Sequence, residues 1–154
     1  MIIYLKLLLT LAVAFALIRT FIFRKESNVF LMIITTGMAA GVIAALFPYK
    51  TVQLTGIGIY FVFVALAFVY GLTANHLKLK ARIVICLMSA PIFLYWLWVL
   101  NHWRGNELLL TIVVLLVGLY GLLTRAKLRN ESGILIMLAA DAIAIIIENW
   151  MKSH

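Results

Sequence analysis

The sequence is dominated by six long apolar runs that only short polar links separate. Apolar residues make up 66% of the 154 residues and charged residues 12%, whereas a water-soluble domain carries about 25% charged residues. A helix needs about 20 mostly apolar residues to cross the ~30 Å hydrocarbon core of a bilayer. We therefore predict an all-α, polytopic membrane protein that forms a single transmembrane domain over residues 1–154. The six predicted transmembrane helices cover approximately residues 2–23, 28–47, 53–74, 82–100, 107–124 and 133–150.

The number of basic residues alternates from link to link. The first, third and fifth links each hold or adjoin three of them, which are Arg19, Arg24 and Lys25, then Lys78, Lys80 and Arg82, then Arg125, Lys127 and Arg129. The remaining links and the two ends hold one each, namely Lys6, Lys50, Arg104 and Lys152. Because cytoplasmic links are enriched in Lys and Arg, we predict a multi-pass protein of the cell (inner) membrane with both termini on the non-cytoplasmic side. This topology and contact with anionic headgroups account for the net charge of +8 without nucleic-acid binding.

The first apolar run also has features of a cleavable signal peptide. The stretch "KLLLTLAVAFA" has a lysine, a short apolar core and an Ala-x-Ala ending at Ala16. Cleavage after it would leave Arg19, Arg24 and Lys25 on the outer side, against the positive-inside rule. We therefore expect this run to be retained as a transmembrane helix.

Two pairs of links resemble one another in sequence. "YGLTANHLKLK" (70–80) and "YGLLTRAKLRN" (120–130) share Tyr-Gly-Leu and a basic turn at an offset of 50 residues. "RKESNVFLMI" (24–33) and "RNESGILIML" (129–138) share Arg, Glu, Ser and Met at an offset of 105 residues. One interpretation is three repeated helical hairpins, since many polytopic folds contain internal repeats. The other is convergence of basic turns between apolar helices, and both stay open.

The sixth apolar run contains two carboxylates, Asp141 near mid-membrane and Glu148 two turns further on the same helix face. A charge at the bilayer centre costs about 2.5–3.5 kcal/mol, and protonating an Asp at pH 7 costs about 4 kcal/mol. We expect either form to face the bundle, a cavity or a partner. Asp141, Glu148 and Thr36, which is the position equivalent to Asp141 at the offset of 105, are candidates for an ion pathway. The structural alternative is helix pairing or partner contact, with Arg19 as a possible ion-pair partner of Asp141.

Small residues at a spacing of four predict helix-packing faces in two of the runs. The stretch "GMAAG" contains Gly37 and Gly41, and the sixth run contains Ala140 and Ala144. Such residues let helix backbones approach closely where lipid removes the hydrophobic drive for association. The pattern is compatible with contacts inside the chain and with self-assembly.

Motifs for nucleotide binding, nucleophilic hydrolysis and metal binding are missing from the sequence. We therefore expect a protein that is not an enzyme and that carries no metal site and no cofactor.

The stretch "NHWRGNELLL" (101–110) resembles the His-Trp-Pro-Gly turn that enters an apolar helix in small polytopic membrane proteins of the Bacteroidetes. These include the membrane part of the motor subunit of their gliding and secretion machinery. Arg104 stands where those proteins have proline, and the similarity covers ten of the 154 residues. The resemblance implies membership of a larger machine, and no site residue is carried over from it.

Two functions therefore remain to be distinguished. The first is a non-catalytic integral membrane subunit that acts in a homo-oligomer or a larger membrane protein complex, with the lipid bilayer around it. This is favoured because the links leave no room for a domain outside the membrane. The second is a small proton- or cation-linked transporter or channel that uses Asp141 and Glu148.

Overall fold

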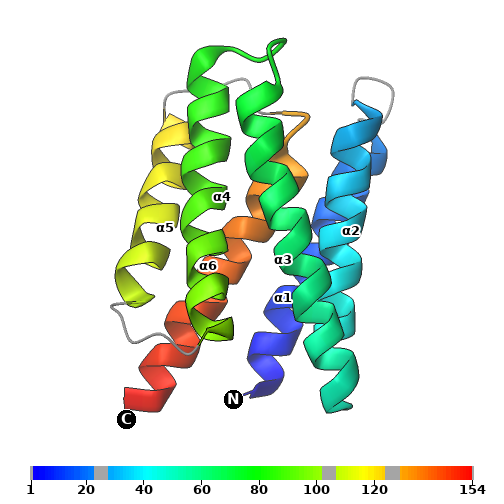
Figure 1. Cartoon of the computed structure of the whole chain (residues 1–154), viewed down its shortest axis with the longest axis vertical. Helices are drawn as coiled ribbons and strands as arrows, with labels where there is room; N and C mark the ends of the chain where they lie inside the picture. The colour runs from blue at the N-terminus through cyan, green and yellow to red at the C-terminus, as the bar shows by residue number, and fades with distance from the viewer. Residues whose placement is uncertain (1, 23–27, 102–106, 124–128, 154) are drawn as a thin grey trace.

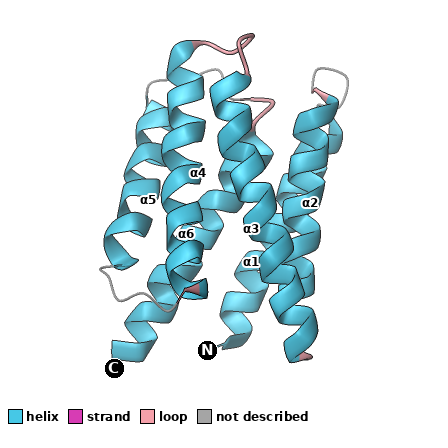
Figure 2. Ribbon diagram, in the orientation of Figure 1, coloured by secondary structure: helices cyan, strands magenta, loops and turns pink. Residues whose placement is uncertain are grey.

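The computed structural model describes residues 2–22, 28–101, 107–123 and 129–153. Over these ranges the chain forms six α-helices and no β-strand (Figures 1 and 2). The helices are α1 (Ile2–Ile22), α2 (Val29–Ala45), α3 (Lys50–Thr73), α4 (Leu79–Leu100), α5 (Glu107–Leu123) and α6 (Ser132–Ser153). The predicted all-α fold is confirmed, and every helix ends within three residues of its predicted boundary.

Four of these helices, α1, α3, α4 and α6, are long and apolar enough to cross a membrane. The other two, α2 and α5, are apolar but shorter, with 17 residues each. At 1.5 Å per residue they extend about 25 Å, which is somewhat less than the hydrocarbon thickness of about 30 Å. The length criterion therefore identifies four candidate spans rather than six.

Local side-chain chemistry explains several helix ends. The side chain of Asn28 caps α2 by accepting a hydrogen bond from a backbone N–H two residues later. α2 ends three residues before Pro48, which disfavours helical conformation in the residue before it. Arg82, on α4, donates to the carbonyl oxygens of Gly71 and Leu72 near the end of α3. A cation at that position stabilises the negative end of the α3 dipole.

The helices are arranged as a closed ring. Each helix packs against its neighbours along the chain, and α1 packs against α6. α6 also contacts α2 and α4, so it lies partly inside the ring. α1 begins and α6 ends at the same end of the bundle (Figure 1).

The most extensive helix contact is between α2 and α3, and glycines make it possible. A β-carbon at Gly56 would lie 2.4 Å from the backbone nitrogen of Ala45 and 2.7 Å from the carbonyl oxygen of Gly41. A β-carbon at Gly37 would overlap a phenyl ring of α3. Gly37 and Gly41 therefore pack inside the chain, against the next helix.

Each helix buries one face and leaves an apolar face exposed. Ala140 and Ala144 of α6 lie on a buried face, with 6% and 5% of their surface exposed. By contrast, Leu11 on α1 is 62% exposed and Leu116 on α5 is 61% exposed. A bundle that is apolar on its outside as well as in its core is suited to lipid.

Several residues that the sequence analysis singled out lie outside the described ranges. They are Arg24, Lys25, Arg104, Arg125, Lys127 and the His-Trp-Arg-Gly motif at 102–105.

Candidate functional site

Asp141 lies in the interior of the bundle, with 8% of its surface exposed. Its Oδ2 atom accepts a hydrogen bond of 3.1 Å from the indole Nε1 of Trp96. Because Trp96 belongs to α4, this bond joins α4 to α6 in the apolar part of the bundle. The carboxylate is therefore kept away from lipid by a neutral donor of the same chain.

Trp96 is held in place by two tyrosine rings. The ring of Tyr60, from α3, meets the indole edge to face with a centroid distance of 6.4 Å. The ring of Tyr95 does the same at 5.5 Å. Edge-to-face contacts of this kind are the preferred aromatic geometry. They restrict the indole and keep its N–H directed at Asp141.

Tyr60 is a second candidate donor to the carboxylate. Its side chain is 3% exposed, and its hydroxyl interacts electrostatically with Asp141. The two groups stop short of hydrogen-bond geometry, and the Tyr60 hydroxyl is the one buried side-chain polar atom without a hydrogen bond in the described part of the chain. Leaving such a group unpaired costs about 1–3 kcal/mol.

The structure separates the other residues proposed with Asp141. Glu148 is half-buried two turns further along α6 and interacts electrostatically with Asp141. Arg19 instead donates from Nε to the hydroxyl of Ser132 at 3.3 Å, about 13.5 Å of helix rise from Asp141. Thr36 is exposed, and its hydroxyl donates to the carbonyl oxygen four residues earlier in its own helix. Arg19 and Thr36 are thus placed away from Asp141, and Glu148 lies about 10.5 Å of helix rise from it along α6.

Two buried hydroxyls in the core also bond within their own helices. Thr35 donates to the carbonyl of Leu31 at 2.9 Å, and Ser89 donates to the carbonyl of Ile85 at 2.7 Å. Both are bonds to the preceding helical turn, a common use of Ser and Thr in apolar surroundings. These donors do not extend the polar cluster around Asp141.

Sequence reasoning missed Trp96 and Tyr60 as partners of the acid. Both stand inside an apolar helix, since Tyr60 is ten residues from the start of α3 and Trp96 is four residues from the end of α4. A buried Tyr or Trp needs a partner for its O–H or N–H. A carboxylate in an apolar helix is the natural acceptor for such a donor. The need of a buried Tyr or Trp for an acceptor is therefore the sequence signal that could have linked these aromatic residues to Asp141.

A second polar cluster lies where α6 begins. Glu131 is 3% exposed and interacts with Tyr70 at the end of α3 and with His76 in the following link. The Tyr70 hydroxyl and His76 Nε2 are 3.3 Å apart. Burial raises the pKa of the Glu131 carboxyl above its ordinary value of 4.5, although its own backbone N–H, the charge of His76 and the Tyr70 hydroxyl oppose the shift. This cluster joins the start of α6 to the α3–α4 link.

Comparisons of the chain with protein-family models, with curated proteins and with solved structures find no match. The helices and their exposed faces define the class of the protein. A helical bundle with four helices long and apolar enough to cross a bilayer, and with apolar outer faces, is a multi-pass integral membrane protein. Across residues 2–22, 28–101, 107–123 and 129–153, no group of three or more His, Cys, Asp or Glu side chains is placed to hold a metal ion.

Proposed function

We propose that the chain crosses the membrane six times and acts as a non-catalytic subunit of a homo-oligomer or a larger membrane complex. Six crossings are supported by the packing of α2, which makes the most extensive helix contact in the bundle with α3 and brings Gly37 and Gly41, one turn apart, against that helix. A length of 17 residues is at the lower limit for a spanning helix. The alternation of basic residues between links supports the same threading and orients the termini outward.

The observation that carries the subunit proposal is the structural use of the intramembrane acid. Asp141 accepts a hydrogen bond from Trp96 and lies near Tyr60, so that α3, α4 and α6 converge on one carboxylate. A polar bond between helices in an apolar medium fixes which helices pair and in what register. In this role the carboxylate needs neither to exchange protons with water nor to bind ions.

The outer helix faces supply the surface through which such a subunit would act. α1 carries an exposed apolar stripe at a spacing of three and four residues, formed by Leu7, Leu11, Phe15, Ile18 and Ile22. α5 carries a similar stripe, formed by Leu109, Ile112, Leu116, Leu119 and Leu123. These spacings place each stripe along one side of its helix, where it can lie against lipid or against a neighbouring helix.

Purification and cross-linking test the subunit proposal. The full chain in mild detergent should show the mass of an oligomer or retain a stoichiometric partner protein. In a Cys86→Ala background, Leu11→Cys or Leu116→Cys should cross-link to a neighbouring chain in the membrane. Val13→Cys is the matched control, because Val13 is 4% exposed and faces the core. A monomer with no partner and no cross-link from either stripe would contradict the proposal.

A second candidate function, a proton- or cation-linked transporter or channel, is favoured by a different observation. The Tyr60 hydroxyl interacts with Asp141, and Glu148 lies two turns further along α6, so polar groups extend from Asp141 toward the end of α6. In proteoliposomes, Asp141→Asn should then abolish proton or cation flux. Thr36→Val, on an exposed face, should leave the flux unchanged. The candidate fails if the wild-type protein conducts nothing, or if Asp141→Asn conducts like wild type.

A further inference from the structure

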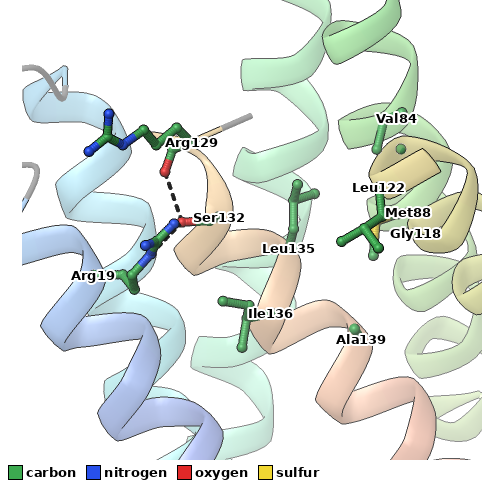
Figure 3. A pocket seen from close by; sticks show the side chains of 11 residues that line it. Arg19, Val84, Met88, Gly118, Leu122, Arg129, Ser132, Leu135, Ile136 and Ala139 are labelled. Carbon is green, nitrogen blue, oxygen red and sulfur yellow. Dashed lines mark hydrogen bonds between the residues drawn. The ribbon is translucent and has the colours of Figure 1, made fainter. Parts of the chain in front are cut away.

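A groove with a volume of about 830 Å³ lies along the first turns of α6. Its floor is formed by α6, and its walls come from α1, α4 and α5. Figure 3 shows Arg19 of α1 on one side of α6, with Val84, Met88 and Leu122 on the other. Gly118 lines the α5 wall and has no side chain to narrow the groove there. The volume is in the range of pockets that hold drug-sized ligands.

One end of the groove is basic. Arg19 and Arg129 lie there, with the hydroxyl of Ser132 beside them (Figure 3). That hydroxyl accepts from Arg19 Nε at 3.3 Å and donates to the backbone carbonyl of Arg129 at 2.8 Å. Ser132 therefore positions the side chain of Arg19 and fixes the backbone of Arg129 at the start of α6. Guanidinium groups carry a permanent charge and match the geometry of phosphate oxygens.

The rest of the groove is apolar. Its floor continues along α6 from Ser132 through Leu135 and Ile136 to Ala139. Ala139 lies seven residues beyond Ser132, which is about 10.5 Å of helix rise. Since the arginines lie at the end of the spans, where headgroups are found, the apolar floor lies at the depth of the acyl chains. The groove is thus polar at the headgroup level and apolar below it, which is the profile of a phospholipid.

We propose that this groove binds one anionic phospholipid. The phosphate contacts Arg19 and Arg129, and one acyl chain lies over Leu135, Ile136 and Ala139. Basic pockets between transmembrane helices select anionic headgroups in this way. The inference requires that the bundle be inserted in a membrane, but it is independent of the subunit proposal. It holds equally for a monomer.

The test is lipid retention by the full-length protein in detergent, measured by native mass spectrometry during titration with phosphatidylglycerol or phosphatidylcholine. Wild type should retain one phosphatidylglycerol with at least tenfold preference over phosphatidylcholine. Arg19→Gln and Arg129→Gln should each weaken phosphatidylglycerol binding about fivefold. Lys80→Gln is the matched charge control, because Lys80 is an exposed basic residue of α4 that does not line the groove. It should leave the preference unchanged.

The acyl-chain contact has its own variant. Ala139→Leu fills the floor without changing any charge, so it should weaken phosphatidylglycerol binding although both arginines remain. Ala40→Leu, on the exposed face of α2, is its control. Thermal unfolding in the same detergent shows that each variant is folded. Inorganic phosphate should fail to displace the bound phosphatidylglycerol, because it lacks the acyl-chain contact.

Four results would overturn the proposal: equal retention of the two lipids, equal effects of Lys80→Gln and Arg129→Gln, unchanged binding by Ala139→Leu, or full displacement of the lipid by inorganic phosphate. The last result would identify the site as one for a free anion.

Discussion

The contact between α2 and α3 gives the sharpest structural prediction, through a pair of glycines two residues apart. A β-carbon at Gly56 would lie 2.4 Å from the backbone nitrogen of Ala45 and 2.7 Å from the carbonyl oxygen of Gly41. A β-carbon at Gly58 would have no heavy atom within 4 Å. The same substitution, Gly to Ala, should therefore have opposite effects at the two positions.

The size of the effect follows from the distances. Ordinary contact begins at 3.4 Å, so Gly56→Ala must separate the two helix backbones by about 1 Å. A gap of that size forfeits a quarter to a half of the dispersion energy of each contact that it opens. Overpacking typically costs about 1–3 kcal/mol, and here the clash is with backbone, which cannot rotate away. We expect Gly56→Ala to lower the free energy of unfolding by about 3 kcal/mol.

Gly58→Ala is the matched control, because it gains helix propensity without a clash. It should raise the free energy of unfolding by about 0.5–1 kcal/mol. The assay is reversible unfolding in mixed micelles with increasing sodium dodecyl sulfate, followed by circular dichroism. Equal effects of the two substitutions, or a stabilising Gly56→Ala, would refute the close packing of α2 on α3.

Two further predictions concern the polar clusters. In a double-mutant cycle of Trp96→Phe and Asp141→Leu, which remove the donor and the acceptor, the free energies of unfolding should show a coupling of about 1–2 kcal/mol, in the range for interhelical bonds in membranes. Strictly additive effects would mean that the indole N–H does not bond the carboxylate. Burial raises the pKa of the Glu131 carboxyl in the folded state above its ordinary value of 4.5. The folded protein therefore binds more protons than the unfolded chain in this pH range. Its stability should fall as the pH rises from about 4.5 through the raised pKa. Glu131→Gln should remove this pH-dependent loss in thermal unfolding scans, and an unchanged pH profile in the variant would contradict the assignment.

The helices themselves could be predicted because the length of an apolar run decides whether it can span a bilayer. Their boundaries differed mainly where polar residues join a helix end. α3 begins at Lys50 rather than at residue 53, and α6 continues to Ser153 rather than ending at residue 150. Lysine can extend its charged end to the headgroups while its stem covers apolar surface. A basic residue therefore changes the local composition of the sequence without ending the helix.

The rotation of each helix about its axis was not predictable from the sequence. Thr35 is buried and Thr36 is exposed, although the two residues are chemically identical neighbours in a helix that is apolar on all sides. That Asp141 lies inside the bundle follows from the cost of placing a charge in lipid. Its pairing with Trp96 depends on how α4 is turned, and an almost uniformly apolar helix carries no amphipathic pattern to specify this.

The number of membrane crossings is the central claim, and cysteine accessibility tests it most directly. In a Cys86→Ala background, single cysteines replace Asn28, Tyr49, Asn75 and Asn101, which are all exposed at helix ends or links. With six crossings, a membrane-impermeant maleimide added to intact cells should label positions 49 and 101, and should reach positions 28 and 75 only after permeabilisation. If α2 does not cross the membrane, positions 28 and 49 lie on the same side and will be labelled alike, which would contradict the six-span account.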